Sequence, residues 1–173
     1  MALIKEMLNH LNGEVKLIST YYDDISPCID CRYCWQNQCC SIKDEMQEVY
    51  RLLDEVDNII LASPLYFSEL TGKLLSFASR FQSFYVSRTI RKDSSFKLKN
   101  KNGVLIITGG GDGDPESAIE RANIILRQIN AKLIGKVLSL KTNNIPAKED
   151  YEALGQAREL ALRLNHYSDI ITR

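Results

Sequence analysis

Apolar positions follow two kinds of spacing along this chain, one typical of buried strands and one typical of helices. Three short runs are apolar almost throughout: residues 58–62 (NIILA), 103–108 (GVLIIT) and 132–140 (KLIGKVLSL). A strand that is buried on both faces of a parallel sheet produces such a run. Residues 15–20 (VKLIST) instead alternate between apolar and polar positions and contain β-branched residues. That alternation predicts a fourth strand.

Amphipathic segments lie between these predicted strands. Apolar residues at helical spacing predict helices over residues 2–11, 45–54, 69–83, 115–130 and 148–165. Strands that alternate with helices indicate an α/β fold with a parallel sheet. The length of 173 residues fits one domain over residues 1–173. Residues 88–101 are basic and predicted to be irregular, either as a solvated loop or as a contact with a phosphate or a partner.

Two loops with unusual chemistry follow predicted strands. Residues 63–67 (SPLYF) follow the first apolar run, and residues 108–113 (TGGGDG) follow the second. Because the carboxyl ends of parallel strands meet at one edge of a sheet, we expect both loops to face one crevice. The aromatic residues could flank a planar ring, or they could cap the core. The glycines could let the backbone approach an anion or a flavin edge, or they could form an ordinary turn.

All five cysteines of the chain lie between residues 28 and 40 (CIDCRYCWQNQCC). Four of them, Cys28, Cys31, Cys34 and Cys39, follow the pattern C-x-x-C-x-x-C-x-x-x-x-C, and Cys40 comes next. Packing does not call for this spacing, whereas iron–sulfur clusters and soft metals do. An odd number of cysteines placed this closely makes a poor disulfide framework. Three interpretations remain open: a [4Fe–4S] cluster on these four cysteines, free thiols, or a zinc site.

Charge and composition limit the partners and the types of reaction that this chain could have. The 22 basic residues balance the 22 acidic residues, which gives no indication of a nucleic-acid or membrane partner. The apolar runs are far shorter than the roughly 20 residues of a membrane span. The start of the chain does not resemble a signal peptide, so we expect a cytoplasmic, reducing setting. Only two histidines occur, and no hydrolase motif is present.

Several segments together resemble a known family. PCIDCRYCWQNQC, SIKDEM, LASPLYFSELTGKLLSFASRF and GVLIITGGG are similar to the flavodoxin-like NAD(P)H-dependent FMN reductases, in particular to the cysteine-bearing branch that includes iron–sulfur flavoproteins. The resemblance is collinear over residues 2–165. It implies a flavodoxin-like three-layer sandwich with a parallel sheet of order 2-1-3-4-5, noncovalently bound FMN, and a homodimer or homotetramer. The residues that it places beside the flavin are Ser63, Pro64, Leu65, Tyr66, Phe67, Thr108, Gly109, Gly110, Gly111 and Asp112.

The activity that the resemblance implies is electron transfer from NAD(P)H through FMN to a flavin, a quinone or a protein acceptor. The flavin carries out this chemistry, so no side chain is assigned as a catalytic acid or base. If the cysteines hold an iron–sulfur cluster, it would turn the two-electron flavin into a one-electron donor. The alternative function is a noncatalytic metal- or partner-binding module that has lost its flavin site.

The chain departs from the family pattern in two places. Family members begin with a strand and a loop of the form G-S-P-R-x-x-S-x-T, which holds the FMN phosphate at a helix N-terminus. This chain starts within the helix that should follow, so strand 1 is missing from the pattern and an open seam is expected in the sheet. Either the sequence is shortened relative to the family, or another segment or subunit fills the gap. The second departure is Ser79, where relatives usually carry Asp before the arginine, here Arg80. We expect this change to weaken an ion pair at the helix end.

Overall fold

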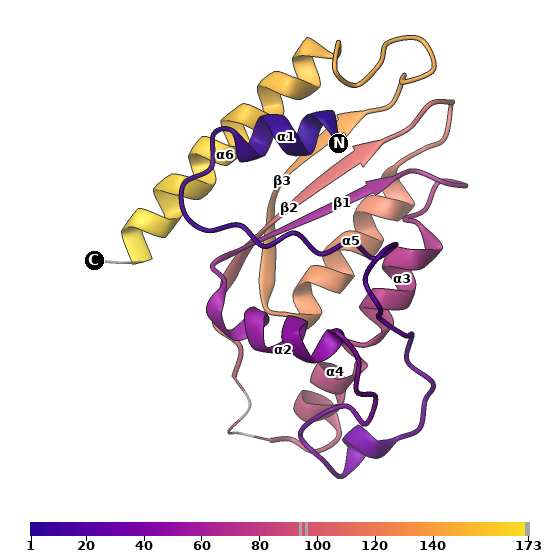
Figure 1. Cartoon of the computed structure of the whole chain (residues 1–173), viewed down its shortest axis with the longest axis vertical. Coiled ribbons are helices and arrows are strands. Elements are labelled where there is room, and N and C mark those ends of the chain that lie inside the picture. The colour runs from indigo at the N-terminus through magenta and orange to yellow at the C-terminus, as the bar shows by residue number, and fades with distance from the viewer. Residues whose placement is uncertain (94, 96, 172–173) are drawn as a thin grey trace.

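Three parallel strands form the sheet of the computed structural model, which describes residues 1–93, 95 and 97–171 (Figure 1). The strands are β1 (Asn58–Pro64), β2 (Lys101–Thr108) and β3 (Ala131–Ser139), in the order β1-β2-β3. Ile60 is paired with Val104, and Val104 is paired in turn with Gly135. The three apolar runs are therefore strands, and their parallel pairing confirms the predicted α/β class.

Helices cover both faces of the sheet, so the predicted three-layer sandwich is confirmed. Val104 and Ile106 of β2 belong to a core with α1 (Ala2–Leu8) and α6 (Tyr151–Ile171) on one face. Leu105 and Ile107 point to the opposite face, because successive side chains of a strand alternate. There they pack with helices α2 (Met46–Glu55), α3 (Gly72–Ser79), α4 (Gln82–Thr89) and α5 (Glu116–Gln128) (Figure 1).

The helix predicted over residues 69–83 is two shorter helices, α3 and α4. Between them, the N–H groups of Arg80 and Phe81 donate to the carbonyls of Phe77 and Ala78, three residues back. Such bonds tighten the backbone at a helix end. The turn keeps Phe77 and Phe81 in the same core, where their rings pack edge to face. It also places the side chain of Arg80 at the junction of the two helices.

The strand predicted over residues 15–20 is wrong. The segment has no regular secondary structure, and Val15 and Leu17 are exposed. A strand needs a hydrogen-bonding neighbour. In the predicted order 2-1-3-4-5, the neighbour of this segment would be strand 1, and the described residues form no strand ahead of β1. The order is therefore confirmed only for its last three positions, which β1, β2 and β3 occupy.

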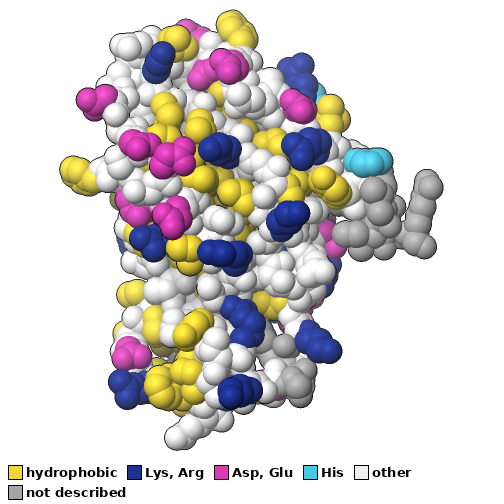
Figure 2. All heavy atoms as spheres, turned by 180° about the vertical axis from the view of Figure 1, so that it is seen from behind, with side chains coloured by type: hydrophobic (Ala, Val, Ile, Leu, Met, Phe, Trp, Pro, Cys, Tyr) yellow, Lys and Arg dark blue, Asp and Glu magenta, His cyan; other side chains and the backbone are white. Residues whose placement is uncertain are grey.

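The surface carries charges of both signs. Figure 2 shows basic and acidic side chains distributed over one face of the molecule, with apolar side chains between them. The basic stretch of residues 88–101 is not simply irregular, since α4 extends into it and β2 begins at Lys101. Lys101 is buried and donates to the Ile129 carbonyl, and Lys99 pairs with Asp57. No helix in the described part of the chain has the length and apolar character needed to cross a membrane.

Candidate functional site

The loops that follow the three strands meet at one edge of the sheet. The Leu65 N–H donates to the Thr108 carbonyl at 2.7 Å, and the Gly109 N–H donates to the Ser139 carbonyl at 2.8 Å. The Thr142 N–H then donates to the Gly109 carbonyl at 3.0 Å. These bonds continue the parallel pairing beyond the strands. The structure thus brings the two predicted loops together, and a third loop after β3 joins them.

The loop after β1 exposes its two aromatic side chains. Tyr66 is 60% exposed and Phe67 is 104% exposed, so neither of them caps the core. Backbone bonds between Tyr66 and Glu69 close the turn. Phe67 and Ser68 have φ angles of 53° and 61°, a left-handed conformation that non-glycine residues seldom adopt. This turn holds the Phe67 ring in solvent at the edge of the sheet.

The other residues of this loop support it. Ser63 is buried, and its hydroxyl donates to the Pro64 carbonyl at 2.8 Å and accepts from the Thr71 N–H at 3.1 Å. The hydroxyl is therefore engaged within the chain. Leu65 lies against Gly109 and Gly113, where an added Cβ would come within 3.4 Å of its side chain. Pro64, Tyr66 and Phe67 are the exposed members of the predicted set in this loop.

The glycine loop after β2 offers open backbone. Gly111 and Asp112 are exposed, and a Cβ added to Gly111 would meet no atom within 4 Å. Gly110 is different, because a Cβ there would lie 2.3 Å from Oδ1 of Asn143. Asn143 belongs to the loop after β3 and was not predicted from the sequence. The one feature of the sequence that points to Asn143 is its position just after the strand predicted over residues 132–140.

Four thiols of the cysteine loop line one pocket, and they are not the four of the predicted set. The pocket is lined by Cys28, Cys31, Cys34 and Cys40, together with residues that include Arg80. Cys39 is exposed and is not part of the lining. The structure thus brings three of the four predicted cysteines together and adds Cys40 in place of Cys39.

Local backbone geometry folds the cysteine loop around this pocket. Asp30 and Arg32 have left-handed φ angles of 49° and 57°, and a short 3₁₀ helix follows at Tyr33–Trp35. The Arg32 guanidinium lies over the Trp35 ring at 5.2 Å from its centroid. These two turns bring thiols that are three residues apart in the sequence to the same side of the loop.

Burial and neighbouring groups shift the pKa values of two of these thiols, those of Cys34 and Cys31. Burial raises the pKa of the Cys34 thiol, and the neighbouring thiols of Cys28, Cys40 and Cys31 raise it further. A hydrogen bond with the Ser41 hydroxyl, at 3.2 Å, lowers the pKa of Cys31. Among the side chains that the structure describes, no group of three or more His, Cys, Asp or Glu could hold a metal ion.

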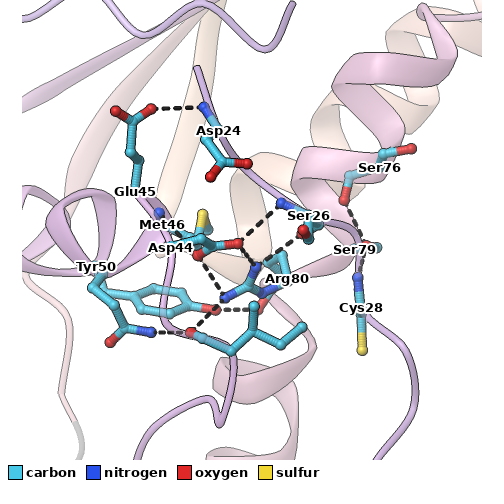
Figure 3. Close-up of polar contacts among 12 residues, drawn as sticks. Asp24, Ser26, Cys28, Asp44, Glu45, Met46, Tyr50, Ser76, Ser79 and Arg80 are labelled. Atoms are coloured by element: carbon cyan, nitrogen blue, oxygen red, sulfur yellow. Dashed lines mark hydrogen bonds and ion pairs between the residues drawn. The ribbon is translucent and has the colours of Figure 1, made fainter. Parts of the chain in front are cut away.

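A buried ion pair closes the base of the cysteine loop (Figure 3). Arg80 Nη1 donates to Asp44 Oδ2 at 2.6 Å and to the Ser26 carbonyl at 2.8 Å. Nη2 donates to Asp44 Oδ1 at 3.1 Å and to the Ile42 carbonyl at 3.4 Å. The Arg80 side chain is 0% exposed, and the Asp44 side chain is 6% exposed. We call these contacts the Arg80 clasp, since Ser26 precedes the cysteines and Ile42 and Asp44 follow them.

The clasp shifts the pKa values of both partners. Burial alone would raise the pKa of Asp44, but the hydrogen bonds from Arg80 and from the Ser26 N–H outweigh it and lower that pKa. Burial alone would lower the pKa of Arg80, and the hydrogen bond to Asp44 outweighs that effect. Both groups are therefore held in their charged forms. Tyr50 supports the clasp from α2, where its hydroxyl donates to the Arg80 carbonyl at 2.9 Å.

Two further contacts hold the loop. The Ser79 hydroxyl accepts from the Cys28 N–H at 2.9 Å, while Arg80 next to it pairs strongly with Asp44. The expected weakening of an ion pair at this helix end is therefore not seen for Arg80. Arg91, from the basic stretch, donates to the Cys34 carbonyl at 2.6 Å and also to the Asn37 carbonyl. The role of Arg91 was not predictable from the sequence, because nothing in a basic run shows that one of its side chains reaches 57 residues back along the chain.

Comparisons with known proteins agree with this architecture. The model of the family described as NADPH-dependent FMN reductase matches residues 1–144. An iron–sulfur flavoprotein of Methanocaldococcus jannaschii is 32% identical over 123 residues, which cover 69% of this chain and 60% of that protein. An iron–sulfur flavoprotein of Archaeoglobus fulgidus is 28% identical over 163 residues, which cover 94% of this chain and 69% of that protein. The chain thus spans about two thirds of the length of these relatives.

Solved structures show the same fold. A flavone reductase superposes with a TM-score of 0.70 at 15% identity. The superposition includes 99% of this chain and 59% of the flavone reductase chain. An FMN-dependent NADH-azoreductase from Bacillus anthracis, solved in complex with FMN, superposes with a TM-score of 0.61 at 16% identity, with 95% of this chain and 88% of that one covered. With a family model that matches most of its length, the chain belongs to the NADPH-dependent FMN reductase family and has the flavodoxin-like α/β fold.

Proposed function

We propose that this chain binds FMN at the crevice formed by the strand-end loops and acts as an oxidoreductase. Electrons would pass from NAD(P)H through FMN to a flavin, a quinone or a protein acceptor. The observation that carries the proposal is the pair of exposed aromatic side chains, Tyr66 and Phe67, beside the open backbone of Gly111 at the carboxyl edge of a parallel sheet. Ligands of such sheets bind at this edge.

The residues at this edge suit a flavin ring in chemical character. Tyr66 and Phe67 offer flat apolar surface against which a planar ring can stack. The backbone N–H groups of Gly110, Gly111 and Asp112 can donate to polar atoms at the edge of the ring. Ser63 and Leu65 would act indirectly, because their contacts hold the loop in place. When bound, FMN supplies the exchange of two electrons with a nicotinamide and their release to an acceptor.

We propose further that the cysteine loop holds a [4Fe–4S] cluster on Cys28, Cys31, Cys34 and Cys40. The shared pocket of these four thiols supports this set over the set with Cys39. Cysteine thiolates are the usual ligands of such clusters. Relatives described as iron–sulfur flavoproteins lend the proposal further support. A homodimer or homotetramer, with its interface beside the flavin, stays a prediction.

The flavin part of the proposal is tested by titrating the purified chain with FMN and following the quenching of flavin fluorescence. We expect saturable binding at one FMN per chain, and bleaching of the bound flavin when NADH or NADPH is added without oxygen. Phe67→Ala should weaken binding, whereas Leu162→Ala, a matched change at an exposed apolar residue of α6, should not. Absence of FMN binding would refute the proposal and favour the noncatalytic module.

The cluster part is tested by reconstitution with iron and sulfide under anaerobic conditions. We expect about four irons and four sulfides per chain for the wild type, as the composition of the cluster requires. Cys40→Ser should lower the iron content and the visible absorbance, and Cys39→Ser should leave both unchanged. The opposite result for these two neighbouring residues would restore Cys39 as the fourth ligand. Normal FMN binding without iron uptake would leave the flavin proposal intact and refute the cluster.

A further inference from the structure

One N–H group of Arg80 takes no part in the clasp. The two terminal nitrogens, Nη1 and Nη2, bond to Asp44 and to the carbonyls of Ser26 and Ile42. Nε is buried and has no hydrogen-bond partner among the described residues. A buried donor without an acceptor costs about 1–3 kcal/mol, and native proteins seldom leave one. The position of Nε therefore points to an acceptor that is not part of the protein.

The surroundings of Arg80 indicate what kind of acceptor this is. Arg80 lines the same pocket as Cys28, Cys31, Cys34 and Cys40. Burial lowers the pKa of Arg80, but Asp44, Tyr50 and the Cys40 thiol raise it, so the sulfur of Cys40 lies within electrostatic reach of the guanidinium. The pocket lining also includes Asp30, Ser41, Gln82 and Ser83, and its four cysteines are the residues that an iron–sulfur cluster would bind. The thiolates and inorganic sulfides of an iron–sulfur cluster accept hydrogen bonds from N–H groups.

We propose that Arg80 Nε–H donates a hydrogen bond to a sulfur of the cluster held by the cysteine loop and thereby raises its reduction potential. This inference rests on the proposed [4Fe–4S] cluster. Reduction adds one electron and makes the sulfurs more negative, so a hydrogen-bond donor stabilises the reduced form more than the oxidised form. Because the clasp fixes the other two nitrogens, Nε has little freedom to turn away. Arg80 is thus a positioning residue for the loop and a tuning residue for the cluster.

The substitution Arg80→Lys separates these two roles. Lysine keeps the positive charge that pairs with Asp44, but it has no Nε–H. Arg51→Lys is the matched control, since Arg51 is 56% exposed on α2 and pairs with Glu48 and Glu55. The measurement is the midpoint potential of the reconstituted cluster, followed by electron paramagnetic resonance during a redox titration. We expect Arg80→Lys to lower the reduced-to-oxidised ratio about tenfold at a fixed potential, equivalent to about 59 mV for one electron, and Arg51→Lys to leave it unchanged.

A direct measurement covers the case in which Arg80→Lys does not load a cluster. Wild-type protein with isotope-labelled arginine should show hyperfine coupling between an arginine nitrogen and the reduced cluster in pulsed electron paramagnetic resonance. A wild-type cluster of full iron content without this coupling would overturn the inference and leave the cluster proposal standing. An unchanged potential in a fully loaded Arg80→Lys variant would have the same consequence. Failure of the wild type to take up iron and sulfide would refute the cluster proposal, and this inference with it.

Discussion

The two candidate cofactor regions of this chain are held in opposite ways. The strand-end loops are joined by backbone hydrogen bonds, from Leu65 to Thr108 and from Gly109 to Ser139, which extend the pairing of the sheet. The cysteine loop is held mainly by side chains from elsewhere in the chain, chiefly Arg80, Arg91 and Ser79.

This difference determines what single substitutions can do in each region. Where the backbone makes the contacts, a side chain at the site can be replaced without loss of the fold, and the change acts on the ligand. Where one buried side chain makes several contacts, its loss or the loss of its partner leaves polar groups unsatisfied. We therefore expect the cysteine loop to be the region in which function and stability are coupled.

The largest expected effect comes from Asp44→Ala, which leaves the Arg80 charge buried without its partner. Breaking a buried ion pair in this way costs about 3–5 kcal/mol. The free energy of unfolding from urea titrations measures the loss. Asp57→Ala is the control, since the Asp57–Lys99 pair is about 40% exposed on both sides (43% and 39%) and an exposed pair contributes about 0–1 kcal/mol. Equal losses for the two variants would show that the clasp does not dominate this region.

The same ion pair gives the chain a defined response to acid. The pKa of Asp44 is lower in the folded state than in the unfolded chain. The pKa of an unfolded aspartate is about 3.9. A carboxyl group with a lower pKa in the folded state stabilises the fold above the unfolded pKa, and this stability is lost as the pH falls through the folded pKa. We expect the free energy of unfolding to fall more steeply below about pH 4 in the wild type than in Asp44→Asn. Parallel curves would contradict the assignment.

A smaller effect is expected for Arg91→Ala, which removes the donors to the Cys34 and Asn37 carbonyls. Hydrogen bonds from charged groups contribute about 1.5–3 kcal/mol, so we expect a loss of about 2 kcal/mol. The loop should also open locally, and trypsin should cleave after Arg32 faster than in the wild type. Arg88→Ala is the control, because Arg88 lies in the same basic stretch but bonds to Gln128 instead. Equal cleavage rates in the two variants would rule out Arg91 as an anchor of the loop.

Tyr50→Phe should cost about 1 kcal/mol, the usual contribution of one hydrogen bond, here the bond to the Arg80 carbonyl. Burial raises the pKa of Tyr50 to about 12. A raised folded pKa means that stability is fully present below the unfolded value of about 10 and is lost as the pH rises toward the folded value. Wild-type unfolding free energy should therefore decline from about pH 10 upward, and the decline should be smaller in Tyr50→Phe. The same decline in both proteins would place its cause elsewhere.

Sequence patterns predicted the parts of this molecule that depend on local spacing. Residues 58–62 and 103–108 are largely apolar because their side chains pack into the cores on both faces of the sheet, and that property is visible in the sequence itself. Residues 15–20 have the alternation of a strand, but a strand also needs a neighbour, which spacing alone does not supply. The two strand-end loops were found because the parallel topology sends both to one edge.

The cysteine loop shows where such prediction ends. The sequence places Cys39 and Cys40 side by side, and only the fold of the loop determines that Cys40 lines the pocket. That fold depends on left-handed turns at Asp30 and Arg32, and on an arginine 36 residues away from its partner Asp44. These are long-range and conformational properties, which leave no period in the sequence.

The smallest expected effect on stability comes from Phe67→Ala, in the region held by its backbone. Phe67 is 104% exposed, so its removal should change the free energy of unfolding by less than about 0.5 kcal/mol. An aromatic stacking contact contributes about 0.5–1.5 kcal/mol, so FMN affinity should fall by about two- to tenfold. Phe67→Gly should lose the same affinity and gain some stability, because glycine adopts a φ of 53° without strain. A large loss of stability in Phe67→Ala would mean that side chains hold this loop too, and the contrast with the cysteine loop would no longer stand.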